Sequence, residues 1–319
     1  MRVWMAMTMV AVAAVNLCWG QAIVSPQATE RSLRFLFVSP CVNEAFFGPV
    51  KKGMRDAAAL LGVQCEFVGT EDVDVPAQCE LIRKGLSGGY DGIAVDIIDP
   101  TGFDAVLKEA RSKGMPVVVF NTDGGKDRSL RMSAVSQNLY EAGRTVGRAA
   151  LENLPRGCKV LFTQHSKGIS ALDDRLSGIR EVLETKGITG EVLICGTTPA
   201  QAEKAIGEAL QADPTIKGVL GTGQADTEGA GLAVEHMRAK RTCYVAGFDL
   251  SPAILRLLKA GVIDFTIDQQ PYIQGFYPVV QLTQYCRYGI LPADIDAGAS
   301  VIRPADADRI LILSKGEYR

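Results

Sequence analysis

The chain has 319 residues, of which 47% are hydrophobic and 22% charged, and its formal net charge is −2. The length suits two domains of roughly 100 to 200 residues each, and the composition is that of an ordinary globular protein rather than a disordered chain. Because 34 basic and 36 acidic residues are evenly mixed, no basic surface is available for a nucleic-acid backbone, and we expect no nucleic-acid partner.

Residues 1–22 are typical of a secretory signal peptide. A positive start at Arg2 precedes the apolar run VWMAMTMVAVAAVNL, which is too short for a membrane span. Cleavage after Gly20 or Ala22 fits the small residues found there. Cys18 raises the alternative of an acylated lipoprotein, but Leu17 lies where such sites usually need a small residue. We therefore expect soluble export.

The cysteines beyond this segment predict no disulfide framework. Export would permit disulfides, but the remaining cysteines are odd in number and lack C-x-x-C spacing. We expect most of them to be small buried side chains. They are Cys41, Cys65, Cys79, Cys158, Cys195, Cys243 and Cys286.

From residue 33 the sequence alternates short apolar runs with segments of helical periodicity. The runs predict strands at 33–38, 63–68, 92–97 and 116–120. Apolar residues at helical spacing predict helices at 46–61, at 76–87 and around 103–110. Strands that alternate with helices call for a parallel sheet covered on both faces.

A second half repeats this pattern after a break at 121–129, a strand at 131–135 and a helix from about 138. Strands are predicted at 158–163, 191–195, 217–221, 243–248 and 264–267. Helices are predicted at 169–186, 199–212, 226–239 and 251–260. We therefore predict an α/β fold of two doubly wound parallel-sheet lobes.

Polar and aromatic side chains follow the predicted strands. In open parallel sheets, ligands bind beyond the carboxyl ends of the strands, so these side chains are candidate ligand contacts. Amides and carboxylates can bond neighbouring hydroxyls, and aromatic rings can cover the C–H face of a sugar, which together favours a neutral polyol. The candidates are Asn43, Glu44, Phe46, Phe47, Asp96, Asn121, Asp123, His165, Gln224, Asp249, Gln269 and Gln270.

Some of these candidates have structural alternatives. Phe46 and Phe47 open a helix, and we expect one ring to face a cleft and the other to pack inward. Asp249 is left free for a ligand, because Ser251 followed by Pro252 already supplies the N-cap of the next helix.

Arg175 and the two histidines complete the candidates for direct contact. Arg175 flanks the apolar stripe of its helix, so it either reaches into a cleft or is an ordinary solvated arginine. His165 lies at a strand end, whereas His236 lies in mid-helix, where a structural role is expected.

Motifs for catalysis are absent from the sequence. It contains no G-x-S-x-G, no phosphate-binding P-loop and no G-x-G-x-x-G between the first strand and helix. With two separated histidines and no Cys/His cluster, we expect no metal and no cofactor. The sequence predicts binding without turnover.

Four stretches resemble the exported substrate-binding proteins of ABC sugar importers, the class of ribose- and galactose-binding proteins. They are NEAFF, PVVVFNTD, GFDLSP and TIDQQPYIQGF, and the likeness extends from about residue 33 to 303. The resemblance implies that the following residues contact a ligand: the aromatic pair Phe46 and Phe47, Asn121, the helix arginine Arg175, the pair Phe248 and Asp249, and Gln269, where the chain crosses between lobes.

The sequence also departs from that family. Asn43, Glu44 and Ala45 stand where relatives commonly have Asn-Pro, and Thr122 replaces a usual arginine. Thr198 lies where relatives often place an aromatic residue. These changes leave the sugar open: a pyranose, a linear polyol or a non-standard ligand such as the autoinducer-2 furanose.

The resemblance further implies a periplasmic, monomeric protein that delivers its ligand to a membrane permease. One lobe would combine 33–136 with 270–301, and the other 137–269 with 302–319, through crossings near 136, 269 and 301. Two alternatives are less consistent with the sequence. The effector-sensing part of a LacI-type repressor needs a helix-turn-helix before residue 33, and a sugar dehydrogenase needs a phosphate loop.

Overall fold

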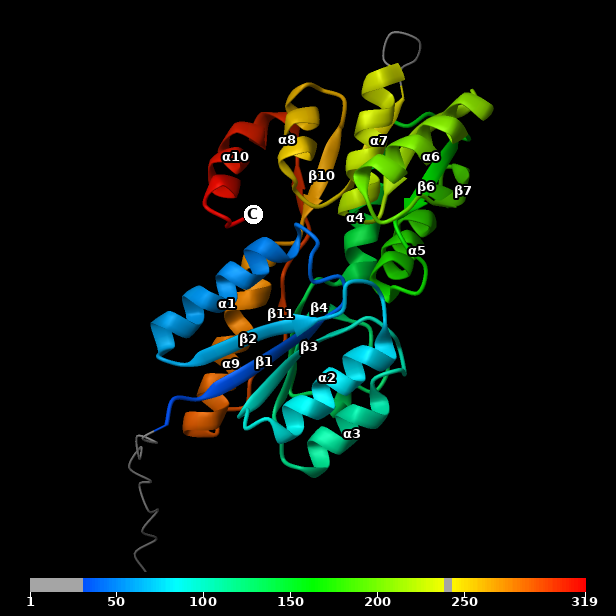
Figure 1. The fold of residues 1–319 in the computed structure, drawn as a ribbon. Helices are drawn as coiled ribbons and strands as arrows, with labels where there is room; N and C mark the ends of the chain where they lie inside the picture. Colours follow the sequence, from blue (N-terminus) through cyan, green and yellow to red (C-terminus); the bar gives the residue numbers. More distant parts are fainter. Residues whose placement is uncertain (1–30, 238–242) are drawn as a thin grey trace, which may run out of the picture. The chain divides into compact units, whose positions relative to one another are not determined.

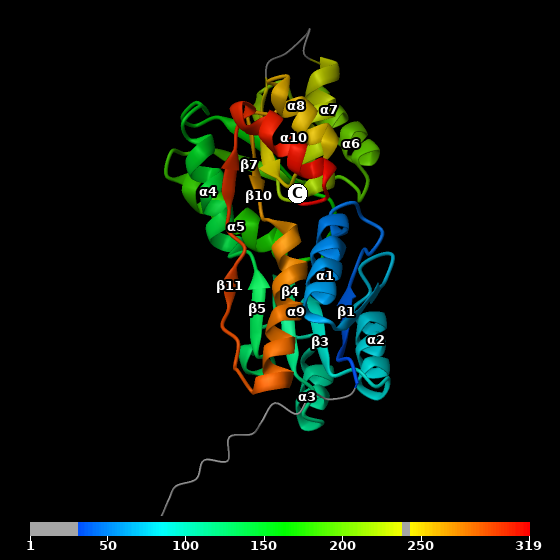
Figure 2. The same cartoon turned by 90° about the vertical axis from the view of Figure 1, so that its left-hand side faces the viewer.

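The computed structural model describes residues 31–237 and 243–319 (Figures 1 and 2). The predicted signal peptide, with Cys18 and both alternative cleavage points, lies outside the described residues.

Two six-stranded sheets form the framework of the described chain. The first has the order β11-β5-β4-β3-β1-β2, and its strands are all parallel. Its strands are β1 (Arg34–Ser39), β2 (Gln64–Gly69), β3 (Gly92–Ile97), β4 (Val117–Asp123), β5 (Ser133–Ser136) and β11 (Ile295–Asp296).

The second sheet has the order β12-β10-β9-β8-β6-β7 and is parallel except for β12, which runs antiparallel to β10. Its strands are β6 (Lys159–Gln164), β7 (Thr189–Ile194), β8 (Ile216–Gly221), β9 (Tyr244–Phe248), β10 (Phe265–Asp268) and β12 (Ser300–Ile302). The prediction of two doubly wound parallel sheets is confirmed.

Helices cover both faces of each sheet. Those of the first sheet are α1 (Phe47–Leu61), α2 (Val75–Ser87), α3 (Asp104–Ser112) and α9 (Pro271–Tyr288). Those of the second are α4 (Leu139–Ala150), α5 (Ser170–Glu184), α6 (Pro199–Ala212), α7 (Gln224–Met237), α8 (Pro252–Lys259) and α10 (Ala307–Lys315). Two short 3₁₀ helices lie at Arg128–Leu130 and Pro304–Asp306.

The elements after residue 270 were not predicted. The sequence of α9 contains Gly275 and Pro278 in its interior, and it begins after Gln270, whose φ is +52°. Glycine and proline are poor helix formers, so local propensity hid this helix. The apolar residues that it buries include Val279 and Leu282, which lie against the first sheet.

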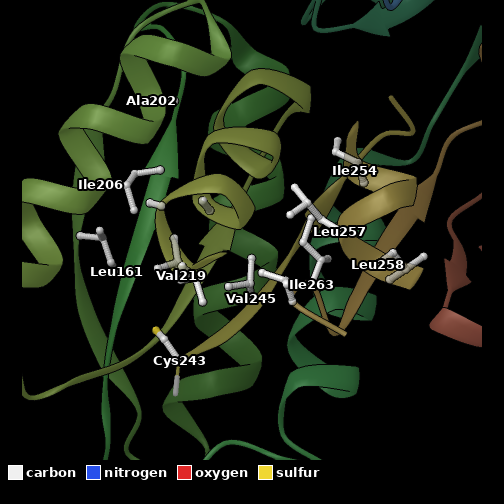
Figure 3. Packing of buried hydrophobic residues seen from close by; sticks show 14 of the residues in the cluster. Leu161, Ala202, Ile206, Val219, Cys243, Val245, Ile254, Leu257, Leu258 and Ile263 are labelled. Carbon is white, nitrogen blue, oxygen red and sulfur yellow. The ribbon is translucent and has the colours of Figure 1, made fainter. Parts of the chain in front are cut away.

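Apolar side chains fill the space on both sides of each sheet. In the second sheet, Leu161, Val219 and Val245 of neighbouring strands pack against Ile206 of α6 and Leu257 of α8 (Figure 3). The opposite face of the same sheet buries a second cluster beneath α4 and α5. Burial on both faces explains why these strands read as continuous apolar runs.

Two helix pairs pack with their backbones in close approach. A Cβ on Gly53 of α1 would lie 2.0 Å from the carbonyl oxygen of Tyr272 in α9, and one on Gly275 would lie 1.9 Å from that of Val50. The pair α4 and α5 repeats this arrangement at Gly143 and Gly178. Figures 1 and 2 show α1 and α9 side by side in both views.

The chain passes between the sheets in three segments, 137–138, 269–270 and 297–299. Side-chain amides join these segments: Gln137 Nε2 donates to Gly298 O at 2.8 Å, and Gln270 Nε2 donates to Ala297 O at 2.9 Å. Gln274 Nε2 donates to Gln269 O at 2.7 Å. Two of the glutamines in TIDQQPYIQGF, Gln270 and Gln274, therefore satisfy backbone carbonyls where the chain leaves the sheets. The assignment of the crossings to a hinge between moving lobes stays a prediction.

The close approach of α1 and α9 gives a stability prediction. We expect Gly53→Ala to lower the free energy of unfolding by about 1–3 kcal/mol, because the added methyl group meets backbone that cannot move independently. Chemical denaturation followed by circular dichroism would measure this change.

Gly207 of α6 is a matched control, because a Cβ there meets no atom within 4 Å. Gly207→Ala should leave the stability unchanged or raise it by roughly 0.5–1 kcal/mol. Equal losses in the two variants would contradict a steric role for Gly53.

Candidate functional site

Loops from both sheets line a cavity of about 80 Å³. Its walls contain the residues that follow β1, β3, β4, β6, β8, β9 and β10, as expected for the carboxyl ends of parallel strands. Most of the candidates predicted from the sequence come together here. Those that line the cavity are Glu44, Phe46, Phe47, Asp96, Asn121, Thr122, His165, Arg175, Gln224, Asp249 and Gln269.

Asp96 organises the first sheet's side of the cavity. Its carboxylate is fully buried and accepts hydrogen bonds from Ser39 Oγ at 3.0 Å, Asn121 Nδ2 at 2.8 Å and the Thr122 backbone N–H at 3.1 Å. Burial raises the pKa of Asp96 to about 6, although these donors lower it. The ends of β1, β3 and β4 are thus held together by one carboxylate.

Asn121 and Asp249 occupy equivalent backbone positions at strand ends. Both have left-handed conformations, with φ of +60° and +73°. Asn and Asp tolerate this region better than other non-glycine residues, because their short polar side chains can bond locally. Asn121 lies near the end of β4 and Asp249 directly follows β9, and both line the cavity.

Asp249 is 6% exposed and accepts a hydrogen bond from Gln269 Nε2 at 2.6 Å. Burial raises the pKa of Asp249, opposed first by the Arg175 guanidinium and then by Gln269. Ser251 caps α8 by accepting from the Ile254 N–H, so Asp249 takes no part in that cap. The prediction that Ser251 caps this helix is confirmed.

Arg175 is buried beneath the cavity rather than solvated. It is 4% exposed, and its Nε and Nη2 donate to Gln137 Oε1 at 3.1 and 2.8 Å. Its Nη1 donates to Thr222 O at 2.9 Å, and its guanidinium lies 4.2 Å from the centroid of the Phe248 ring. Arg175 therefore connects the first crossing segment with the ends of β8 and β9.

The two rings of the aromatic pair differ in burial, although both line the cavity. Phe47 is 3% exposed and packs in the cluster that contains Phe67 and Phe120. Phe46 is half-buried, meets Phe47 edge-on with centroids 5.2 Å apart, and forms part of the cavity wall. Phe46 is thus the more accessible of the two aromatic side chains at the cavity.

Five candidates do not line the cavity, among them Gln270, whose amide donates to Ala297 O. Asn43 is exposed, and Phe248 is fully buried under Arg175. Asp123 pairs with Arg131, which contacts it at 2.9 and 2.6 Å. Thr198 caps α6 in a reciprocal capping box with Gln201. The polar groups of Asp123 and Thr198 are thus taken up by an ion pair and by a helix cap.

Apolar wall residues were missed because no polar signal marks them. Leu139 begins α4 directly after the first crossing, and Ile169 and Leu172 belong to the start of α5. The remaining unpredicted wall residues are Pro40, Cys41, Ile98, Ala171, Gly223 and Ala225. Gln137, which holds Arg175, was also missed.

A second cavity of about 180 Å³ adjoins the first and shares Phe46, Gln224 and Asp249 with it. Its far wall is formed by Ser314 and the segment that follows α10, including Arg319. Arg319 Nε lies 2.7 Å from Asp268 Oδ2.

The described residues contain no group of His, Cys, Asp and Glu side chains suited to a metal ion. Within 31–237 and 243–319, none of the helices is long and apolar enough to cross a membrane. Cys41, Cys79 and Cys195 are buried thiols, in agreement with the expected role as small apolar side chains.

Comparison with known proteins identifies a family. Residues 35–289 match the family model described as periplasmic binding protein domain. A xylose/arabinose-binding protein of Sulfolobus acidocaldarius is 29% identical over 299 residues, which cover 89% of this chain and 74% of that protein.

Solved structures give the same result. A glucose-galactose binding protein from Geobacillus stearothermophilus superposes with a TM-score of 0.78 at 26% identity, covering 87% of this chain and 99% of that one. A carbohydrate transporter from Acidothermus cellulolyticus in complex with myo-inositol gives 0.79 at 25% identity, covering 91% and 100%. The matched family consists of binding proteins, which confirms the prediction that this chain is not an enzyme.

His165 at the cavity wall gives a pH prediction. Burial and the nearby Arg175 lower the pKa of His165 to about 4, below its ordinary value of 6.5. The unfolded chain therefore binds the proton at higher pH than the folded protein does, so stability is present above about pH 6.5 and is lost as the pH falls toward about 4. Between pH 6.5 and pH 4, we expect the free energy of unfolding of His165→Gln to fall less than that of the unmodified protein, by on the order of 2 kcal/mol. Urea denaturation at several pH values in this range would measure the difference.

The other histidine supplies the control. His236 is exposed on α7, and its Nδ1 lies 2.6 Å from Glu203 Oε1. His236→Gln should retain the steep loss of stability at acidic pH. An unchanged acid dependence in His165→Gln would show that His165 is not buried as a neutral group.

Proposed function

Because this chain belongs to the periplasmic binding protein family, we propose that it is an exported solute-binding protein that captures a small sugar or polyol in the cavity between its two sheets. The observation that carries the proposal is the convergence of hydrogen-bonding groups from both sheets on one cavity. Asp96 and Asn121 come from the first sheet, and Arg175, Asp249 and Gln269 belong to the second sheet and its crossing segment.

The chemistry of the wall supports a hydroxyl-rich ligand. Asn121, Gln224 and Gln269 supply amides, Asp249 supplies an acceptor, and the Phe46 ring offers an apolar face for sugar C–H groups. A ligand that bridges groups from both sheets would favour the arrangement in which the two sets face each other. Binding energy would then be coupled to lobe closure.

The similar proteins extend this support to ligand class. Their names specify xylose and arabinose, glucose and galactose, and myo-inositol, all small polyhydroxylated molecules. We propose that this chain binds a molecule of the same size. Glu44 and Thr122 differ from the residues usual in the family, so the identity of the sugar depends on the first sheet's loops.

We further propose that the protein acts in the periplasm as a monomer and delivers its ligand to the permease of an ABC importer. The apolar leader at residues 1–22 supports export, and the family match supports the importer context.

A thermal-shift panel of pentoses, hexoses, alditols, inositols and autoinducer-2 tests the function. A ligand at 100 times its dissociation constant should stabilise the protein by about 2.7 kcal/mol. We expect Asp249→Asn to abolish most of this shift, because the variant loses the negative acceptor beside Arg175 while keeping the shape of the side chain.

Asp308→Asn is the matched control, since its carboxylate is exposed and bonds Lys259 far from the cavity. It should respond to ligand as the unmodified protein does. A full ligand response in Asp249→Asn would overturn the site, and a panel without any response would overturn the function.

A further inference from the structure

Acidic side chains outnumber basic ones in the lining of the cavity. Glu44, Asp96 and Asp249 are acidic, whereas Arg175 is the cation that reaches the same wall. His165 also lines the cavity, but the pKa lowered to about 4 leaves its imidazole neutral near pH 7. The lining of this cavity therefore carries more negative than positive charge.

The carboxylates of Asp96 and Asp249 have partners within the protein. Asp96 accepts from Ser39, Asn121 and Thr122, which satisfy both of its oxygens. Asp249 accepts from Gln269 and lies in the field of the Arg175 guanidinium. The Arg175 donors are engaged by Gln137 and Thr222, and the carboxylates whose charge acts on its guanidinium are Asp249 and Asp226.

Among the described residues, the partner of the Glu44 carboxylate is the neutral Cys41 thiol, and no cation acts on it. Glu44 lies in the loop between β1 and α1, half-buried at the cavity wall. The nearby lysines of α1 are engaged elsewhere: Lys51 Nζ donates to Val42 O at 2.7 Å, and Lys52 Nζ to Asp56 Oδ2 at 2.9 Å. The charges that act on Glu44 are those of Asp249 and Asp96, which repel its ionised form.

We infer that Glu44 determines ligand specificity by pairing with a positively charged amino group, so that the site prefers an amino sugar or amino polyol to the neutral parent compound. This inference rests on the proposed function, because it concerns the same cavity. It refines the expectation of a neutral ligand that the loop motifs alone support.

The surroundings of Glu44 suit an ammonium group. A cation there gains attraction from the Glu44 carboxylate, while Asp96 and Asp249 line the same cavity and add negative potential. A neutral polyol gains hydrogen bonds to the same acceptors but leaves their mutual repulsion in place. The added charge is therefore the feature that distinguishes the two ligand classes.

Titration of Glu44 gives the inference a second, independent readout. Burial, with repulsion from Asp249 and Asp96, raises the pKa of Glu44 to about 7, although the neighbouring Cys41 thiol lowers it. A bound cation favours the ionised carboxylate, so binding near pH 7 should release a proton. A neutral ligand should not release one.

Isothermal titration calorimetry with matched probes tests the inference. The pairs are 1-amino-1-deoxysorbitol against sorbitol and 6-amino-6-deoxyglucose against glucose, with N-acetylglucosamine as a nitrogen-containing neutral compound. Near pH 8, we expect at least one amine to bind about tenfold more tightly than its neutral parent. At about pH 5.5 this preference should shrink to roughly twofold, because the free protein is then protonated at Glu44.

Glu44→Gln keeps the shape of the side chain and removes its charge. In this variant the preference for the amine should fall to about twofold near pH 8, and the proton release measured in buffers of different ionisation enthalpy should disappear. Glu71→Gln is the matched control, since Glu71 is exposed and its substitution removes the same formal charge from the same lobe. Glu71→Gln should retain both the preference for the amine and the proton release. The comparison between pH 8 and pH 5.5 uses the unmodified protein and so does not depend on the folding of any variant.

The outcomes separate the two hypotheses. Equal or tighter binding of the neutral parents near pH 8, or an amine preference that survives in Glu44→Gln, overturns the inference while leaving a sugar-binding protein in place. Failure of every probe, amine and neutral, together with every other sugar of the thermal-shift panel, overturns the proposed function as well.

Discussion

The buried guanidinium of Arg175 is the interaction on which the geometry of the cavity depends. A charge that is 4% exposed is costly unless its donors are satisfied, and here Gln137 and Thr222 accept its hydrogen bonds while the Phe248 ring lies beneath it. Because these partners come from a crossing segment and from two strand ends, they must stay aligned for the charge to remain buried. Asp249 then faces a positive field that the scaffold holds in place.

Gln137 extends this network from the cavity to the crossings. Its Oε1 accepts from Arg175, and its Nε2 donates to Gly298 O in the third crossing segment. Both polar atoms of the Gln137 amide are thus bonded: the oxygen accepts from Arg175 at the cavity, and the nitrogen donates to the backbone. Two hydrogen-bonded steps, from Arg175 to Gln137 and from Gln137 to Gly298, link the cavity wall to the third crossing segment. The cavity is thus connected physically to the segments about which the lobes would move.

The regular part of the fold follows from the sequence, because apolar runs and helical periodicity report burial directly. β1 to β10 and α1 to α8 lie within a few residues of their predicted positions. The elements after Gln270 escaped prediction, since α9 is stabilised by tertiary packing against α1 despite Gly275 and Pro278. Short strands such as β11 carry too few residues to show any periodicity.

Prediction of the site succeeds and fails for different reasons. Strand ends are visible in the sequence, so Asp96, Asn121 and Asp249 could be found without the structure. Asp123 and Thr198 satisfy the same criterion, but an ion pair and a helix cap engage them, and only coordinates reveal such partners. The burial of Arg175 likewise depends on Gln137, which is distant in sequence.

Contacts between elements of the two sheets would oppose the proposed separation of the lobes. The segment after α10 belongs with the second sheet, yet the Tyr318 ring lies 5.1 Å from that of Tyr272 in α9, and Glu317 lies 3.5 Å from Arg55 in α1. Arg55, Glu317 and Tyr318 are exposed and Tyr272 is half-buried, so each contact is worth about 1 kcal/mol or less. If the lobes separate as the resemblance implies, these contacts break together with the backbone hydrogen bond from Ser170 N to Ile98 O at 3.1 Å. Under that proposal, a ligand bridging Asp96 and Asp249 would shift the population of the closed arrangement through a differential binding energy of a few kcal/mol.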